Sequence, residues 1–408
     1  MNATTARQIK TSPNLRVTNL GLRPSTIIAM GLAALVIAYL VGAFTSIGVS
    51  RFLHAYLLSL CFFLSINLGA LFFVVLQHLT RARWSVVIRR IAELLTSTIP
   101  ILGLLMLPVV VAMVLGDSEL YSWNDAELRQ TDVLIKGKAA YLNAPFFALR
   151  CLFYFATWTA IARFYFTKSV AQDHAADFRP TAQMRKWSGP AMITFAATVN
   201  FAAFDWLMSL DPHWFSTIFG IYFFAGAVVA VLAALTLVSA LLQRFGYLDR
   251  AITIEHYHDL GKLLFGFMFF WAYIAFSQFL LIWYANIPEE TVWYLHRQQH
   301  GWQYVGILLI AGHFLLPFFG LMSRSARRNQ SVLVFWSVFL LAMHWVDLYW
   351  LAIPTVSPER VSVGAMELLT LLGIGAIWAG AFAGKLEGTA LVPTGDPNLG
   401  ESLAFHNV

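Results

Sequence analysis

A few ionisable side chains lie inside long apolar stretches of this chain, where an isolated charge is costly. His344 and Asp347 stand three residues apart and would share one face of a helix. Asp205 and Ser209, four residues apart, would share a face in the same way. Buried carboxylates and imidazoles can take up and release protons near neutral pH, so a spaced series of them with water between its members would carry protons across a membrane.

We predict such a proton path from residues at three depths. The outer half holds Arg150, Asp205, His344 and Asp347, the middle holds His313, and the inner half holds His78, Glu93, Asp259 and Lys262. Structural alternatives remain open for several of them. Asp205 and Arg150 can form a buried ion pair between helices, and His313 can bond to a backbone carbonyl. His78, Glu93 and Lys262, close to the cytoplasmic rim, can snorkel or form interfacial hydrogen bonds alone.

The stretch 343–354 also has the composition of a quinone pocket, because it combines flat rings with a histidine and an acid. The candidate quinone-binding residues there are His344, Trp345, Asp347 and Tyr349. Haem ligation is a weaker alternative. His300 and His313 are thirteen residues apart and could stack two haems, but no second pair with that spacing occurs in an apolar segment.

The two cysteines predict no metal centre in this chain. Cys61 and Cys151 each lie in an apolar run, and neither belongs to a CxxC or CxxCH pattern. The sequence therefore offers no iron–sulfur ligand set and no attachment site for c-type haem. We assign no catalytic residue and expect any redox group to be carried by another chain.

The elements that position these residues follow from composition. Of the 408 residues 59% are hydrophobic and 12% charged, against about 25% charged in an ordinary soluble domain. A bilayer core of about 30 Å requires roughly 20 helical residues, and ten apolar segments reach that length. They are 24–45, 52–80, 91–116, 145–166, 188–208, 214–242, 260–284, 302–322, 331–353 and 364–384. The sequence predicts an all-α integral membrane protein of ten spans.

The distribution of lysine and arginine predicts the orientation. When residues at the span ends are counted with the adjoining loop, twenty of the 27 belong to the tails and the even-numbered loops and six to the opposite loops, which leaves Arg150 inside the fourth span. This bias places both termini in the cytoplasm. We expect a cytoplasmic tail over 1–23, a transmembrane domain over 24–384 and a second cytoplasmic tail, an extended strap, over 385–408. The formal net charge of +6 is mostly this inner rim, which suits an anionic membrane surface, and nothing else favours binding to nucleic acid.

A weak internal repeat predicts how the spans group. The fifth and ninth spans each place an aspartate, Asp205 or Asp347, beside aromatic residues near the outer end. Two four-helix bundles, spans 2–5 and 6–9, would explain this correspondence, with the first and tenth spans flanking them. No nucleotide-binding motif interrupts the series, which disfavours ATP-driven transport by this chain alone.

Three long strings make the chain resemble a known family. They are residues 206–220 (WLMSLDPHWFSTIFG), residues 256–266 (HYHDLGKLLFG) with 283–290 (WYANIPEE), and residues 344–354 (HWVDLYWLAIP). They resemble the ActF-type membrane subunits of bacterial alternative complex III, a quinol:cytochrome c or copper-protein oxidoreductase, over almost all of the chain from about residue 24. That family is itself similar to the NrfD and polysulfide-reductase membrane anchors.

The resemblance implies a fold and a setting. The fold would be two four-helix bundles with two flanking helices, in the inner membrane of a bacterium. Quinol, such as menaquinol, would be the substrate of the whole complex and would bind chiefly to an ActC-like subunit. An extrinsic iron–sulfur protein and multihaem c cytochromes would hold the redox centres. This chain would bind no cofactor and would provide a proton path and structural support.

Alternatives from other classes remain open. A stand-alone proton-coupled secondary transporter would show broken helices with charged sites at mid-membrane. A purely structural anchor would keep its buried acids in ion pairs, and a secondary quinone-binding anchor would use the aromatic stretch around Asp347. Neutralising Asp347 and Asp205 separately would distinguish a proton path from a structural anchor.

Overall fold

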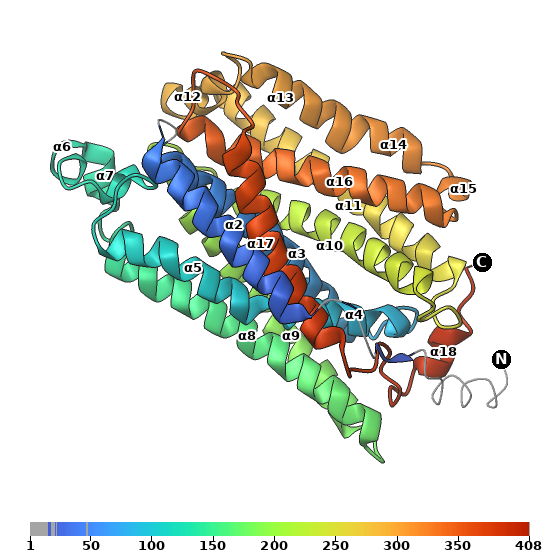
Figure 1. Cartoon of the computed structure of the whole chain (residues 1–408). Helices are drawn as coiled ribbons and strands as arrows, with labels where there is room; N and C mark the ends of the chain where they lie inside the picture. The colour runs from blue at the N-terminus through green and yellow to red at the C-terminus, as the bar shows by residue number, and fades with distance from the viewer. Residues whose placement is uncertain (1–14, 18–20, 22, 46–47, 408) are drawn as a thin grey trace.

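The computed structural model describes residues 15–17, 21, 23–45 and 48–407. The described residues form helices and connecting loops, and no strand occurs among them. Two isolated backbone bridges join residue 16 to 390 and residue 17 to 387. Ten helices or helix runs in this part of the chain are long and apolar enough to cross a membrane (Figure 1). The prediction of an all-α membrane protein with ten spans is confirmed.

The spans alternate in direction along the chain. They are α2 (Pro24–Phe44), α3 (Val49–Leu79), α4 (Val86–Thr96) with α5 (Ile99–Val114), α8 (Ala144–His174), α9 (Arg179–Trp206), α10 (Phe219–Arg244), α11 (Ile254–Ala285), α13 (Trp302–Leu308) with η4 (Leu309–Leu315) and α14 (Leu316–Leu321), α16 (Gln330–Ala352) and α17 (Ala365–Leu386). We call the end of the molecule that holds residues 387–407 the terminal end (Figure 1). The opposite loop end holds the connections 115–143, 207–218, 286–301 and 353–364.

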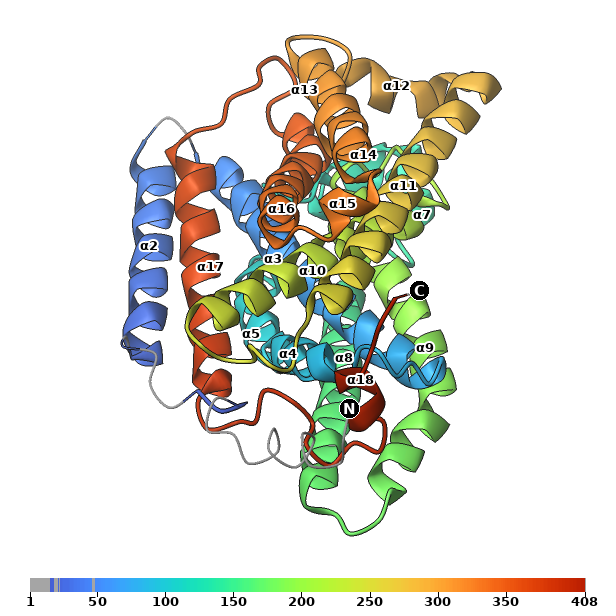
Figure 2. The same ribbon diagram turned by 90° about the vertical axis from the view of Figure 1, so that its right-hand side faces the viewer.

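The spans form two four-helix bundles. Helices α3, α4 with α5, α8 and α9 pack together as the first bundle, and α10, α11, the α13–η4–α14 run and α16 form the second. Helix α3 of the first bundle and α10 of the second lie against each other at the centre of the molecule. Helices α2 and α17 form a separate pair that packs on α3 and stands at one side of the molecule (Figure 2). The predicted grouping of the spans is therefore correct.

Glycine allows the central helices to approach closely. A Cβ atom on Gly69 would lie 2.3 Å from the carbonyl oxygen of Ala227, so any side chain there would separate α3 from α10. The flanking pair is packed in the same way. A Cβ atom on Gly31 of α2 would lie 2.5 Å from the carbonyl oxygen of Gly373 of α17.

Two spans differ from the predicted segments. The third span is interrupted at residues 97 and 98 because Pro100 cannot donate a backbone hydrogen bond there. The hydroxyl of Thr98 instead donates to the carbonyl of Leu95. Helices α8 and α9 continue well past the predicted segments 145–166 and 188–208, and their joined ends project from the terminal end as a helical hairpin (Figures 1 and 2).

The two predicted tails differ in how much the structure describes. Within the predicted tail 1–23, only residues 15–17, 21 and 23 are described, so the remainder lies outside the described residues. The C-terminal tail is described to residue 407. It runs as an irregular strap across the terminal end and includes one short helix, α18 (Leu399–Leu403). Shorter elements at the loop end are η2 (Ser122–Asn124), α6 (Leu128–Thr131), α7 (Val133–Lys138), η3 (Met208–Leu210), α12 (Pro288–His296) and η5 (Ile353–Thr355), and α15 (Arg324–Arg327) lies at the terminal end.

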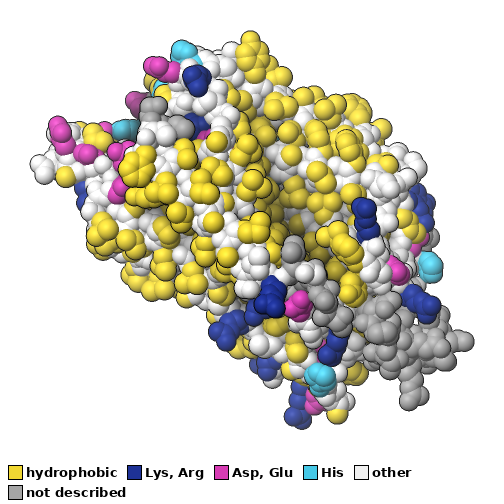
Figure 3. Space-filling view, in the orientation of Figure 1, with side chains coloured by type: hydrophobic (Ala, Val, Ile, Leu, Met, Phe, Trp, Pro, Cys, Tyr) yellow, Lys and Arg dark blue, Asp and Glu magenta, His cyan; other side chains and the backbone are white. Residues whose placement is uncertain are grey.

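The surface matches a membrane environment. Figure 3 shows hydrophobic side chains covering the long face of the molecule, whereas lysine, arginine and acidic side chains gather towards its two ends. Large apolar residues such as Leu152, Phe269 and Leu372 are more than half exposed on this surface. An apolar surface of this extent would be unstable in water and is stable in lipid.

Candidate functional site

The predicted pair of the first bundle is a buried ion pair. Arg150 on α8 donates to both carboxylate oxygens of Asp205 on α9, from Nε at 2.8 Å and from Nη2 at 2.9 Å. The hydroxyl of Tyr154 donates to the same carboxylate at 2.7 Å, and the third nitrogen of Arg150 donates to the carbonyl of Tyr141. The guanidinium also stacks on the Tyr141 ring, 3.9 Å from its centroid. Asp205 is therefore held as a fully paired carboxylate.

The corresponding acid of the second bundle has only neutral partners. The hydroxyl of Tyr222 on α10 donates to one carboxylate oxygen of Asp347 on α16, and the indole N–H of Trp271 on α11 donates to the other at 3.1 Å. No lysine or arginine forms an ion pair with Asp347 within the described part of the chain. Asp347 is 2% exposed, so the two aspartates of the internal repeat occupy chemically different sites.

His344 lies one turn from Asp347 and joins the two bundles. Its Nε2 atom lies 2.8 Å from the hydroxyl of Ser65 on α3, and that hydroxyl already donates its proton to the carbonyl of Phe62. Ser65 therefore accepts a hydrogen bond from His344 Nε2–H. The Nδ1 atom of the neutral ring then carries a lone pair, is buried and has no partner among the described residues. The ring rests on Gly226, where a Cβ atom would come within 2.8 Å of it.

His313 lies beside this pair of residues. Its ring centroid is 3.9 Å from that of Trp271 and 6.4 Å from that of His344. Both ring nitrogens of His313 are buried without a hydrogen-bond partner among the described residues. The backbone carbonyl that we considered as its partner is therefore not bonded to it. A buried imidazole with two unpaired nitrogens is costly, and a water molecule would satisfy it.

A π-helical turn positions His313. The eighth span is α-helical at both ends, but residues 309–315 form a π-helix, in which the N–H of Leu316 bonds to the carbonyl of Ala311. Pro317 explains the wider turn, because it lacks the N–H that would bond the carbonyl of His313, and its ring would collide with that carbonyl in an α-helix. Such turns inside helices occur frequently at functional sites.

The second bundle also contains a buried arginine, which the sequence analysis did not select. Arg297 precedes α13 and so corresponds in the repeat to Arg150 at the start of α8. Its guanidinium forms no hydrogen bond with a carboxylate in the part of the chain that the structure describes. It donates to the backbone carbonyls of Trp293, Trp350 and Leu351 and stacks on the Trp293 ring at 3.4 Å. Burial lowers the pKa of Arg297 to about 9. The guanidinium of Arg297 is thus held away from Asp347.

A line of polar groups leads from His344 towards the terminal end. Gln330, Ser337 and His344 follow one another at intervals of seven residues, so they share the buried face of α16 and lie about 10 Å apart along its axis. The Ser337 hydroxyl is fully buried and has no partner among the described residues, and the same holds for Ser239 on the facing helix α10. Sequence analysis missed both serines.

The line ends in a hydrogen-bonded trio that borders an open hollow. Gln243 accepts hydrogen bonds from Tyr257 at 2.8 Å and from Gln330 at 3.0 Å. Gln243 and Gln330 line a surface hollow of about 770 Å³ at the terminal end, together with Arg244 and Asp249. Water can therefore reach the trio from this end of the molecule.

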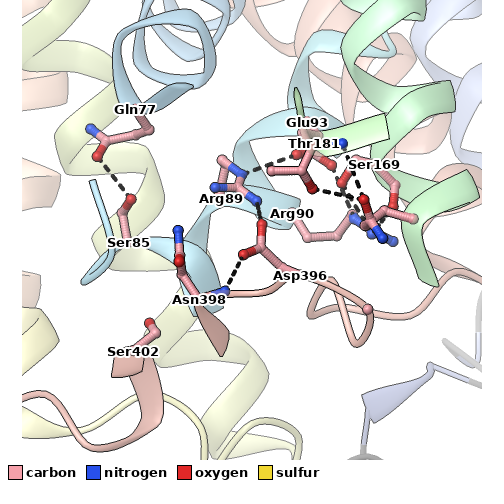
Figure 4. A network of polar contacts seen from close by, with 12 residues as sticks. Gln77, Ser85, Arg89, Arg90, Glu93, Ser169, Thr181, Asp396, Asn398 and Ser402 are labelled. Carbon is pink, nitrogen blue, oxygen red and sulfur yellow. Dashed lines mark hydrogen bonds and ion pairs between the residues drawn. The ribbon is translucent and has the colours of Figure 1, made fainter. Parts of the chain in front are cut away.

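Two of the four predicted inner residues, Glu93 and His78, lie in or beside a second polar cluster, in the first bundle. Arg90 reaches Glu93 at 3.0 Å and Asp173 at 2.9 Å (Figure 4). Arg89 lies 3.5 Å from Glu93 and bonds to Asp396 of the C-terminal strap. The two guanidinium groups face three carboxylates, and all five side chains are nearly inaccessible. His78 lies near this cluster, with its ring centroid 5.2 Å from that of Tyr165.

The remaining inner residues lie at the terminal edge of the second bundle. Lys262 forms an ion pair with Asp259 one turn earlier on α11 and donates to Asn407 of the strap at 2.7 Å. Lys262 therefore contributes to the contact between the strap and the bundle, and Asp259 is its ion-pair partner. Among the described residues, no hydrogen bond links Asp259 or Lys262 to His313, His344 or Asp347.

The structure therefore separates the nine predicted residues into four sites. Arg150 and Asp205 form one site, His313, His344 and Asp347 a second, His78 and Glu93 a third, and Asp259 and Lys262 a fourth. They do not form one continuous file. We define the group of Ser65, Tyr222, Trp271, His313, His344 and Asp347 as the Asp347 cluster.

Other candidate residues have structural partners. Tyr349 donates to the carbonyl of Ser362 at 2.9 Å, and its ring stacks on Trp345. His300 lies in a loop with a positive φ of 52°, outside the helix that carries His313. Arg51 was also missed, although it bonds to Glu367 at 2.6 Å near the loop end. Within the described residues, no group of three or more His, Cys, Asp or Glu side chains could hold a metal ion.

The comparisons with known proteins identify no family. Neither a protein-family model nor a curated protein matches this chain.

Proposed function

We propose that this chain is a membrane subunit of a quinol:cytochrome c or copper-protein oxidoreductase of the alternative complex III type. In this proposal it provides a proton path and braces the assembly, and it holds no redox centre of its own. Its partners would be an ActC-like quinol-binding subunit, an extrinsic iron–sulfur protein and multihaem c cytochromes. The membrane would be the inner membrane of a bacterium, with both termini in the cytoplasm, as the distribution of lysine and arginine favours.

One observation supports the proton path above all others. Asp347 is a buried carboxyl group with two neutral hydrogen-bond donors and no paired cation among the described residues. A carboxyl group in that setting can gain and lose a proton, whereas a carboxylate locked to a guanidinium stays charged. His313 and His344 lie next to it with three unpaired ring nitrogens, so these imidazoles can relay a proton to Asp347.

The path that we propose runs through the second bundle alone. From the hollow at the terminal end, protons would pass the trio of Gln243, Tyr257 and Gln330 and reach His344 through water held at Ser337. Tyr222 and Asp347 would then deliver them towards the loop end. The steps of about 10 Å between polar groups of α16 require bridging water. The first bundle, with its ion-paired Asp205 and Glu93, would be structural.

Purification of the native assembly tests the setting. The tagged chain is extracted in a mild detergent, the co-purifying proteins are identified, and a reduced-minus-oxidised visible spectrum is recorded on the same sample. Co-purification of multihaem c cytochromes and a large iron–sulfur protein would support the proposal. A colourless chain without partners in several mild detergents would contradict it.

A stand-alone proton-coupled transporter is the second candidate, and the π-helical turn at His313 favours it. Transporters place irregular helical segments near the middle of the membrane, where they line a binding site. Proteoliposomes that contain the purified chain alone would decide between the two functions. Solute-dependent proton uptake by the lone chain would favour a transporter, and proton movement that requires the assembled complex and quinol would exclude one.

A further inference from the structure

A lipid-facing groove runs along the boundary between the two bundles. Its two parts meet at Phe224 of α10. One part, of about 290 Å³, lies between α9 and α10, and the other, of about 420 Å³, lies along α11. Helices α9 and α11 lie on the same side of the molecule in Figure 2. The groove is separate from the Asp347 cluster, which lies on the inner side of α10.

Aromatic rings form the walls of the groove. The Phe224 ring meets the Phe72 ring edge to face at 4.8 Å, and Phe195 and Phe267 lie 6.1 and 6.3 Å from Phe72. Such walls accommodate a flat ring by stacking and edge contacts, and they provide few polar contacts. A molecule that enters from the membrane must therefore be apolar over most of its surface.

One polar group interrupts this apolar lining. Asn200 of α9 lies against Gly220 of α10, where a Cβ atom would stand only 1.8 Å from the amide oxygen. Glycine at this position is what allows the amide to lie between the helices. None of the described residues forms a hydrogen bond with the Asn200 side chain, although the residue is half-buried in an apolar setting. An amide without a partner in that setting is costly, and a ligand with a polar atom would satisfy it.

The depth of Asn200 restricts the type of ligand. Asn200 stands six residues before the end of α9, about 9 Å along the helix, and it shares the groove with Phe72 of α3, so the amide lies below the headgroup level. A phospholipid places only hydrocarbon at that depth and cannot satisfy the amide. A membrane-soluble quinone has a flat ring, carbonyl oxygens and an apolar tail. An amide can also donate to the carbonyl of a quinone and accept from the hydroxyl of a quinol.

We propose that this groove binds the head group of a membrane-soluble quinone or quinol, with Asn200 hydrogen-bonded to one ring oxygen. The ring lies against the exposed edges of Phe195 and Phe224, which contact each other at 6.4 Å, and the apolar tail follows the part of the groove along α11 towards the terminal end. This site differs from the stretch 343–354 that the sequence analysis considered for quinone. It also does not depend on the proton path through the Asp347 cluster.

Photolabelling of the full chain in lipid nanodiscs tests the site. The probe is a radioactive azido-quinone, and labelled peptides are identified by mass spectrometry with and without excess unlabelled quinone. We expect label on the peptides of α9 and α10 that contain Asn200 and Ile221, and excess unlabelled quinone should prevent this labelling. Asn200→Leu should weaken the affinity at least tenfold. Ile221→Trp fills the groove from its exposed side and leaves the Asn200 amide intact. It should also weaken the affinity for the quinone probe at least tenfold.

The matched control is Thr194→Val, which removes a polar group from the lipid-facing side of α9 outside the groove. It should retain the affinity of the unmodified chain. Unchanged labelling in both Asn200→Leu and Ile221→Trp would overturn the proposal, as would label confined to α16 or η4. Displacement of the probe by phospholipid but not by quinone would also overturn it, because the groove would then be a lipid site.

Discussion

At the scale of single residues, the two buried aspartates differ in what they contact. Asp205 accepts two hydrogen bonds from Arg150 and one from Tyr154. Asp347 accepts one from Tyr222 and one from Trp271, both of which are neutral. A paired carboxylate is an electrostatic support, and an unpaired one is a group that can exchange protons. This contrast is the basis for assigning proton transfer to the second bundle.

Arg150→Met should destabilise the protein strongly. Removing the guanidinium leaves Asp205 buried without a counter-charge, which typically costs about 3–5 kcal/mol. Thermal unfolding in detergent would measure the loss. The double variant Arg150→Met with Asp205→Asn removes both charges and should recover most of that stability. If the double variant were as unstable as the single one, the uncompensated charge would not be the cause.

The short helix α7 should loosen in acid. The backbone N–H of Ile135 and the imidazole of His213 lower the pKa of the Asp132 carboxyl from its ordinary value of 3.8. A carboxyl group whose folded pKa is lowered contributes stability above its ordinary pKa and loses that contribution as the pH falls through the lowered value. Hydrogen exchange in residues 133–138, corrected for intrinsic rates, should therefore rise below about pH 4.

Asp132→Asn provides the control for this acid response. The variant keeps a side-chain oxygen that can accept from the backbone at the start of α7, but it has no carboxyl group to titrate. Its exchange rates in residues 133–138 should not change further with acid. An equal acid response in the variant would show that another group controls the loop.

The residue scale is also where sequence reasoning was least complete. Aspartate, histidine and arginine inside apolar segments are rare, so Asp347 and Arg150 could be selected from the sequence alone. Ser337 and Tyr222 could not, because serine and tyrosine are common in such segments and become significant only through their neighbours. The pairing of Arg150 with Asp205 was one of two alternatives, and only the positions of α8 and α9 could decide it.

At the scale of elements, the π-helical turn of the eighth span sets the direction of His313. Pro317→Ala restores the missing N–H and removes the ring, so the turn should convert to an α-helix and rotate His313 by about 100°. We expect thermal stability to be unchanged or raised, and proton transfer to fall about tenfold. The rate of proton uptake by the complex reconstituted in vesicles would measure the change in proton transfer. Full proton transfer in a variant whose helix is shown to be regular would contradict this role.

The elements themselves were largely predictable, because ten long apolar segments have no stable place except in a bilayer. The lengths of the helices were less predictable. Hydropathy reports the part of a helix that crosses the lipid, and α8 and α9 continue beyond it into a projecting hairpin. The break in the third span and the π-turn depend on single prolines. A proline in a membrane helix is compatible with a kink, a break or a wider turn.

At the scale of the whole molecule, the C-terminal strap ties the two bundles together. Asp396 reaches Arg89 of the first bundle, and Asn407 bonds to Lys262 of the second. Ser402 lies between them, bonded to the carbonyl of Trp84, while its own carbonyl contacts His256. The sequence predicted a strap but not this role, since tail composition alone carries no information about contacts.

Asp396→Asn should lower the stability of the whole protein by about 2–3 kcal/mol, because it weakens a buried charge-assisted hydrogen bond to Arg89. Glu401→Gln is the matched control. Glu401 belongs to the same strap and pairs with Arg83, but both side chains are more than half exposed, so its loss should cost less than about 1 kcal/mol. Thermal unfolding would compare them. Equal losses in the two variants would contradict the structural role given to Asp396.

The number of protons that the complex moves per electron in proteoliposomes tests the proposed proton path most directly. Asp347→Asn keeps the shape of the side chain and removes its ability to exchange a proton. We predict that this variant assembles, oxidises quinol and loses proton movement through this subunit. The double variant Arg150→Met with Asp205→Asn should retain it. An unchanged proton number in Asp347→Asn, or a loss found only in the Arg150 and Asp205 double variant, would contradict the account.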